Sequence, residues 1–196
     1  MSNAEKFRPV KSVLIAYLFY AFTSFLAIQT LLSSEIIVSI ETALWVTGSN
    51  ILIYVVLHRP YMSLSPEGLK VVNPFDTWRI GWSQIDDLET RFVLKIITSR
   101  DVIPVWVATG PTRSRRERLQ QSDIRGLGFD GMDSISVGES PKSDSGVAAY
   151  LIRQAIHKYN TDSSNLLKEV THVINFRTNF FIILIFTSAF FVNTIH

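Results

Sequence analysis

Two long apolar runs dominate the first third of the chain. They cover residues 13–32 and 36–57, only three residues separate them, and no lysine or arginine occurs between residues 12 and 57. A helix needs about 20 apolar residues to cross a bilayer core, and backbone amides in lipid must be satisfied within the spanning segment. The short linker forces the second helix to return antiparallel to the first. This pattern predicts a transmembrane helical hairpin over residues 12–57.

A cleavable signal peptide is the alternative for the first run. The apolar core of a signal peptide spans roughly 7–15 residues and ends in a cleavage site of small residues. The run here is longer and leads directly into a second span. We therefore favour a retained helix.

A third apolar run closes the chain. Residues 178–195 are uncharged and follow Arg177. This run barely reaches the length of a bilayer core, so a third transmembrane helix is the prediction and an interfacial helix the alternative. Basic residues flank the first two spans on the side away from their linker. The one charged residue of the linker is Glu35. By the positive-inside rule, the N-terminus and the region after residue 57 are cytoplasmic, and the C-terminus is extracytoplasmic, in a plasma (inner) membrane.

Small and polar residues recur at helical spacing in both predicted spans of the hairpin. Such faces let helices approach closely and form hydrogen bonds, either within the hairpin or with another membrane protein. The predicted intramembrane packing residues are Ala21, Ser24, Ala27, Ser39, Thr42, Ser49 and Asn50.

Glu41 is the single ionisable residue inside these two spans. Such residues are costly in lipid and commonly functional. At about 1.5 Å per residue, Glu41 lies about 9 Å from Glu35, within reach of headgroups and water. A solvated or partner-bonded carboxylate is therefore favoured over a proton relay, which would need several such groups in series.

After residue 58 the pattern changes to short β-like runs separated by turn residues. Pro66 and Gly68 mark the first turn, and alternating apolar residues follow the second. Pro104 cannot donate to a β-ladder, which places its strand at an edge or in a bulge. The pattern predicts an antiparallel meander with strands at residues 61–64, 69–72, 78–82, 85–88, 92–98 and 102–108.

Residues 110–146 lack periodicity, as long functional or flexible loops do. They include a basic cluster, and residues 134–137 could add a short strand. On the cytoplasmic side of a membrane, basic residues can contact anionic lipid or a partner, although a solvated loop explains them equally well. The residues of this candidate contact are Arg113, Arg115, Arg116 and Arg118.

A helix is predicted from Asp144, with Asp144 or Ser145 as its cap. Apolar residues recur every four positions from Val147 to Tyr159 and also include Leu151 and Ala155. This stripe is expected to cover the open end of the sheet. An amphipathic linker then leads into the third apolar run.

The middle of the chain, residues 59–160, resembles the bacterial pleckstrin-homology-like (PH-like) domains of small actinobacterial membrane proteins. This likeness implies a strongly bent antiparallel β-barrel capped by a C-terminal helix. Eukaryotic members of the fold bind phosphoinositides through basic residues around the first hairpin loop, but the loop here has Glu67 and no basic residue. The other role that the resemblance implies is binding of another protein through a groove or a sheet edge. The residues that carry the resemblance are Arg59-Pro60, Pro66-Glu67-Gly68-Leu69, Val71, Asn73-Pro74, Ile80, Trp82 and Ile85.

The composition offers little for catalysis. The chain has no cysteine, which excludes thiolate zinc sites, iron–sulfur ligation and cysteine nucleophiles. Asp87 and Glu89 share one side of an extended segment, but a hard-cation site needs more oxygens from other loops. The net charge of +2 shows none of the strong excess of a nucleic-acid-binding surface. We therefore expect that the protein is not an enzyme and that it has no cofactor and no metal site.

The sequence thus predicts an α+β membrane protein in four segments: a cytoplasmic tail (1–11), the hairpin (12–57), the PH-like domain (58–160), and the linker with the third transmembrane helix (161–196). The favoured function is a non-catalytic accessory or assembly subunit of a multisubunit inner-membrane complex, such as a respiratory-chain assembly. Its expected partners are other integral membrane proteins and membrane lipids. The alternative is a membrane-tethered binding module for anionic lipid or a soluble cytoplasmic partner.

Overall fold

The structure is a computed structural model that describes residues 5–33, 35–110, 143–159 and 169–195. The described residues form two compact units, one helical and one rich in β-structure. The helices are α1 (Val10–Ser33), α2 (Ile36–Ile53), the π-helical turn η1 (Tyr54–His58), the 3-10 turn η2 (Trp82–Gln84), α4 (Asp144–Tyr159) and α5 (Phe176–Ile195). The strands are β1 (Glu5–Phe7), β2 (Tyr61–Ser65), β3 (Gly68–Val72), β4 (Asp76–Ile80), β5 (Asp87–Glu89), β6 (Val93–Ile97), β7 (Val102–Thr109) and β8 (Thr171–Ile174).

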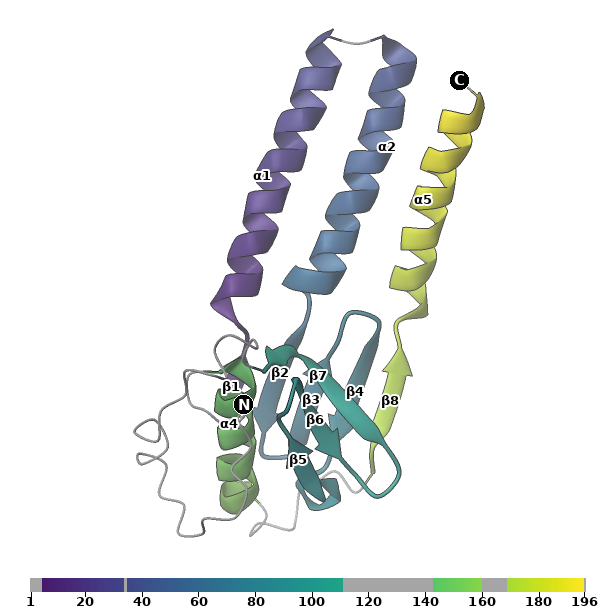
Figure 1. Ribbon diagram of the computed structural model, residues 1–196. Coiled ribbons are helices and arrows are strands. Elements are labelled where there is room, and N and C mark those ends of the chain that lie inside the picture. Colours follow the sequence, from purple (N-terminus) through teal and green to yellow (C-terminus); the bar gives the residue numbers. More distant parts are fainter. Residues whose placement is uncertain (1–4, 34, 111–142, 160–168, 196) are drawn as a thin grey trace. The chain divides into compact units, whose positions relative to one another are not determined.

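The helical unit is built from α1, α2 with η1, and α5 (Figure 1). Val10–Leu32 and Ile36–His58 are each 23 residues long and apolar enough to cross a membrane. The prediction of two long apolar N-terminal helices is confirmed. The apolar stretch found in α5 is shorter, Asn179–Phe191, so a third span stays a prediction.

Small residues bring these helices together. The side chains buried in the helical unit include Ala16, Thr23 and Ala189, and Gly48 is also buried. A Cβ atom on Gly48 would lie 3.0 Å from Cγ2 of Ile185, so α2 and α5 pack closely at this position. Both α1 and α5 contact α2.

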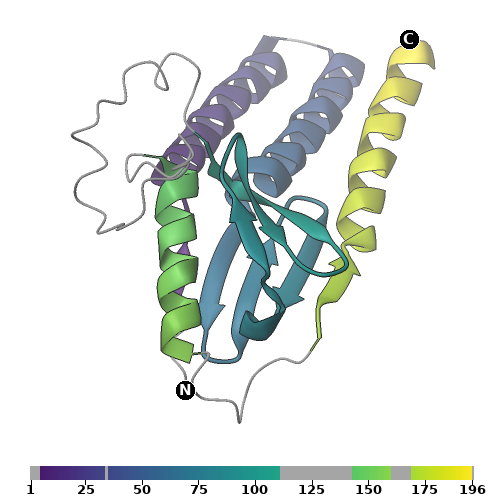
Figure 2. The same cartoon turned by 60° about the horizontal axis from the view of Figure 1, so that its bottom comes forward.

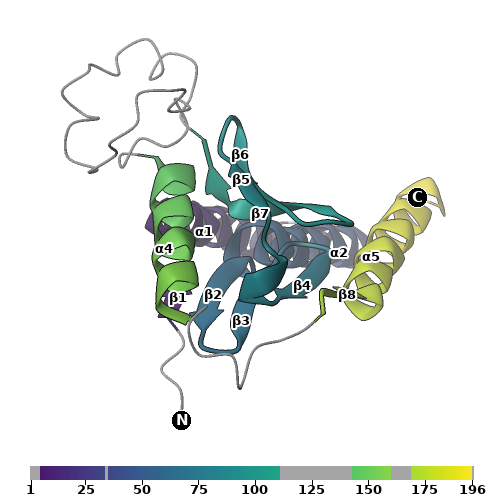
Figure 3. The same cartoon turned by 90° about the horizontal axis from the view of Figure 1, so that it is seen from below.

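The β-rich unit holds two antiparallel sheets. The larger has the strand order β1-β2-β3-β4-β8, and the smaller has the order β5-β6-β7. Figure 3 shows β5–β7 crossing over the larger sheet, with α4 alongside. Buried side chains from both sheets and α4 share one core, which includes Leu64, Leu69, Trp82, Ile96 and Ile152. The α+β layout is therefore confirmed.

The sheets differ from the predicted meander at their edges. Sequence analysis assigned no strand to Glu5–Phe7 or Thr171–Ile174, yet β1 and β8 extend the larger sheet on its two sides. The strand predicted over residues 85–88 begins later, at Asp87, and Trp82 lies in η2 rather than in a strand. The predicted strand at residues 134–137 lies outside the described residues.

The predicted properties of Pro104 both occur. Strand β7 is an edge of the smaller sheet, and the β6–β7 register shifts between Val93 and Lys95, where Lys95 pairs with Pro104. Next to the turn between the two strands, Ile97 pairs with Val102. The hairpin is closed by a hydrogen bond from the Thr98 N–H to the Asp101 carbonyl.

Helix α4, drawn in green in Figure 2, packs against β6 and β7 of the smaller sheet and against η2. Its start corrects the predicted cap: the hydroxyl of Ser143 accepts a 3.0 Å hydrogen bond from the N–H of Gly146, so Ser143 is the N-cap. The buried face also lies slightly off the predicted stripe. It consists of Ala148, Ala149, Ile152 and Ala155, with Leu151, Ile156 and Tyr159 partly buried against the core.

Candidate functional site: a groove on the helical unit

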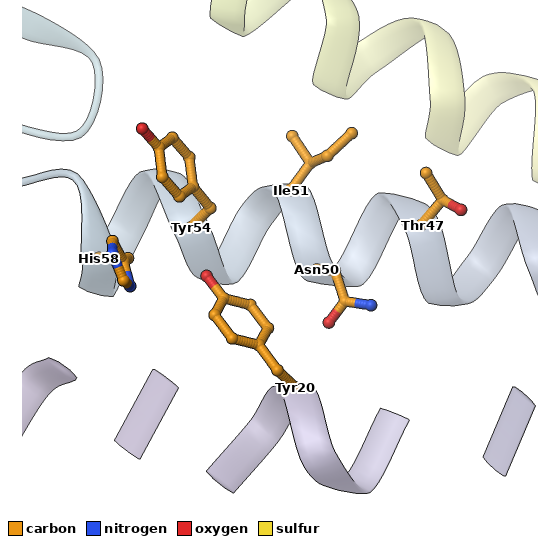
Figure 4. A pocket seen from close by; sticks show the side chains of 6 residues that line it. All are labelled: Tyr20, Thr47, Asn50, Ile51, Tyr54 and His58. Atoms are coloured by element: carbon orange, nitrogen blue, oxygen red, sulfur yellow. The ribbon is translucent and has the colours of Figure 1, made fainter. Parts of the chain in front are cut away.

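A groove with a volume of about 430 Å³ opens on the helical unit, between α1 and the second half of α2. Figure 4 shows Tyr20 pointing from α1 toward α2, and Asn50 pointing from α2 toward α1. The lining residues are Tyr20 from α1, Thr47, Asn50 and Ile51 from α2, and Tyr54 and His58 from η1.

Helical spacing places these residues on one face. Residues three, four and seven positions apart line up along a helix, which fits the spacing from Thr47 to Tyr54. The π-helical turn then continues the helix to His58, and the N–H of Arg59 bonds to the carbonyl of Tyr54 at 2.7 Å. Turns of this kind are rare and often lie at functional sites.

Aromatic rings surround His58 at the end of the groove. The imidazole stacks on Tyr54 with 5.5 Å between centroids and an angle of 23° between the ring planes. Tyr17 meets it edge-on at 5.6 Å, and Tyr20 lies at 6.3 Å. The Nδ1 atom of His58 is buried, and no described residue forms a hydrogen bond with it. The groove therefore ends at a histidine that is packed among aromatic rings.

A hydrogen bond joins the two helices at Asn50, which lines the groove. Thr23 is buried, and its hydroxyl oxygen lies 2.8 Å from Oδ1 of Asn50. The same hydroxyl lies 2.9 Å from the carbonyl oxygen of Phe19. This bond ties the middle of α1 to α2 and holds Asn50 at the groove.

The residues predicted from the sequence are distributed over several places. Asn50 lines the groove and bonds to α1. Glu41 is half-buried on α2, away from the groove lining. Of the other predicted packing residues, Ala21 and Ser24 are exposed, and Ala27, Ser39, Thr42 and Ser49 are half-buried. The cluster from Arg113 to Arg118 lies outside the described residues.

Sequence analysis missed Tyr20, Thr47, Tyr54 and His58 as parts of one site. The available signal was the i, i+4 spacing of Tyr54 and His58 at the end of the second apolar run. Aromatic residues are common at both ends of membrane spans, so this spacing alone does not distinguish a site from an interfacial belt.

The groove is suited to binding through hydrogen bonds and aromatic contacts. Its lining combines a hydroxyl, an amide and an imidazole with tyrosine rings and an aliphatic side chain. Within the described part of the chain, no group of three or more His, Cys, Asp or Glu residues could hold a metal ion.

The chain matches no protein-family model, no curated protein and no solved structure in the comparisons with known proteins. The PH-like interpretation of residues 59–160 therefore stays a prediction from short motifs.

Proposed function

We propose that this protein is a non-catalytic accessory subunit of a multisubunit inner-membrane complex, and that its groove receives a transmembrane helix of a partner subunit. The observation that carries the proposal is a groove with polar and aromatic lining on two helices that are long and apolar enough to span a membrane.

The exposed surface around the groove suits contact with lipid. Large apolar side chains such as Leu18, Phe22 and Phe25 are more than half exposed on α1. Lipid tails are good surroundings for such side chains, but they offer no hydrogen bond to the amide of Asn50, which lines the groove. A partner helix with a polar side chain supplies that hydrogen bond and adds van der Waals contact along the groove.

The proposal includes the topology expected from the sequence. The N-terminus and the β-rich unit face the cytoplasm, and α5 crosses the membrane as a third span, packed on α2 at Gly48. The β-rich unit then acts as a PH-like barrel that clamps neighbouring cytoplasmic surfaces. A respiratory-chain assembly of an actinobacterial membrane is one example of such a complex.

Purification in mild detergent tests this function. The full chain carries a C-terminal tag, and the expected result is a stoichiometric set of integral membrane proteins that elutes with it. A Thr47→Trp substitution fills the groove, because Thr47 lines it and is exposed. We expect this variant to lose at least tenfold of the co-purifying partner.

The matched control is Thr187→Trp, which adds the same side chain at an exposed threonine of α5. It should retain the partner. Equal loss in both variants would assign the contact to general helix packing rather than to the groove. Recovery of the wild-type chain alone would reject a stable complex and favour the membrane-tethered binding module.

A further inference from the structure

A row of basic side chains crosses the larger sheet of the β-rich unit. In the strand register, Lys6 of β1 is opposite Ser63 of β2, Ser63 is opposite Lys70 of β3, and Lys70 is opposite Arg79 of β4. Residues directly opposite each other project from the same face of a sheet. We name Lys6, Lys70 and Arg79 the basic row.

The basic row lies on the face away from the core. The neighbouring row, which consists of Leu64, Leu69 and Ile80, is buried, with at most 3% of each side chain exposed. Because successive residues of a strand alternate between faces, the basic row projects outward. Lys6 and Arg79 are exposed, and Lys70 is half-buried.

Tyr61 holds two of these positive charges together. The Nζ atom of Lys6 lies 4.0 Å from the centroid of the Tyr61 ring, and that of Lys70 lies 5.8 Å from it. None of the three basic residues forms an ion pair with a described residue. Like charges directly opposite on adjacent strands, as in Lys70 and Arg79, repel each other. An anion that contacts both would relieve this repulsion.

Arg8 is the next basic residue after Lys6 in the chain. Its Nε and Nη2 atoms are buried and have no hydrogen-bond partner among the described residues. A guanidinium group has five N–H donors arranged to bind a phosphate in bidentate fashion. Because these two atoms are buried, they do not face a lipid phosphate, and Arg8 is not part of the basic row.

Short segments of chain link the strands of this face to the apolar helices. Lys6 precedes the start of α1 at Val10 by four residues, and β2 begins at Tyr61, three residues after the end of η1. The pairing of Phe7 with Met62 joins these two ends of the chain. At about 3.3 Å per residue, Lys6 lies within about 13 Å of the start of α1. An anionic leaflet attracts basic residues over about this distance.

We propose that the basic row binds the phosphate groups of anionic phospholipids in the membrane that α1 and α2 enter. Binding would dock the sheet on the lipid surface and orient the β-rich unit. This inference rests on the insertion of α1 and α2 in a bilayer, and it does not depend on the accessory role or on the groove.

Lysine acetylation in nanodiscs tests this lipid contact. The purified full chain is placed in discs of phosphatidylcholine alone or of phosphatidylcholine and phosphatidylglycerol in equal amounts, and acetylation rates are read by mass spectrometry. We expect phosphatidylglycerol to slow the acetylation of Lys6 and Lys70 by roughly fivefold, the factor expected for one basic side chain at an anionic surface. High salt should remove this protection. Lys158 is exposed on α4 and serves as the internal reference.

A matched pair of variants locates the contact. Arg79→Gln should reduce the protection of Lys70 at least twofold, whereas Arg100→Gln, at an exposed arginine of the β6–β7 hairpin, should leave it unchanged. Equal acetylation in both kinds of disc would overturn the proposal, and so would equal slowing at Lys158. Because only purified chain and lipid are present, the result is independent of whether a partner subunit co-purifies.

Discussion

Asn73 joins the two sheets through its side chain. Its Nδ2 atom donates to the carbonyl of Pro104 at 2.9 Å, and its Oδ1 atom accepts from the N–H of Trp106 at 3.0 Å. The amide thus pairs with β7 as one residue of a neighbouring strand would. Asn73 is buried, with 6% of its surface exposed, so water cannot substitute freely for these bonds. The sequence suggested only a turn at Asn73-Pro74, because the partner lies 31 residues away.

Asn73→Ala should destabilise the β-rich unit. Two part-buried hydrogen bonds are lost, and a typical hydrogen bond contributes about 0.5–1.5 kcal/mol, so we expect the free energy of unfolding to fall by about 1–3 kcal/mol. Denaturant titration of the full chain in detergent, followed by tryptophan fluorescence, measures this change. Asn73→Asp is the control, because a carboxylate still accepts from Trp106 but cannot donate to Pro104. It should lose at least as much as Asn73→Ala, because a carboxylate oxygen then faces the Pro104 carbonyl oxygen at a buried position. An unchanged midpoint for Asn73→Ala would refute the role of the bridge.

At the scale of elements, the sequence near α4 predicts a helix but not its N-cap residue or its buried face. Ser143, Asp144 and Ser145 are consecutive, and each residue type is a good N-cap. The sequence located the start of the helix but did not distinguish among them. The hydrogen bond from the N–H of Gly146 to the hydroxyl of Ser143 identifies Ser143 as the N-cap. The buried face was likewise set by contact with the sheets rather than by the four-residue repeat alone.

The short edge strands were not predictable from their own residues. Strand β1 has three residues and β8 has four, and every residue of β8 is exposed, so neither shows an alternating pattern. Strands β2 and β4 offer unpaired edges to them, and the backbone hydrogen bonds at those edges need no particular side chains. His172 of β8 also stacks on Trp78 of β4, with 3.9 Å between ring centroids. These strands exist because of their neighbours.

The pairing of α1 with α2 should show coupling between Thr23 and Asn50. We expect a double-mutant cycle of Thr23→Val and Asn50→Ala to give about 0.6 kcal/mol, and at most about 1.7 kcal/mol, the range measured for hydrogen bonds between membrane helices. Unfolding of the full chain by a denaturing detergent provides the free energies. The control cycle combines Thr30→Val with Asn50→Ala. The hydroxyl of Thr30 donates to the carbonyl of Leu26 in its own helix. Comparable coupling in both cycles would argue against a specific bond.

At the scale of the whole molecule, the absence of native cysteine makes the proposed topology directly measurable. Single cysteines are introduced at exposed residues, as Glu35→Cys between α1 and α2, Ser99→Cys in the β6–β7 hairpin, and Thr194→Cys near the end of α5. An impermeant maleimide on intact cells should label positions 35 and 194, and position 99 only after permeabilisation. Labelling of position 99 in intact cells would reverse the orientation. Labelling of position 194 only after permeabilisation would mean that α5 does not cross.

The sequence by itself determined the elements whose physical cause is local. Long apolar runs such as these cross lipid as helices, and alternation with turn residues produces the main strands, so the two apolar helices and the α+β layout were predictable. Tertiary structure decided what depends on distant residues: the edge strands, the Asn73 bridge, the groove and the basic row. Each of these results from pairing between segments far apart in the chain. Strand register and helix contacts set that pairing, and neither is encoded in any single stretch of sequence.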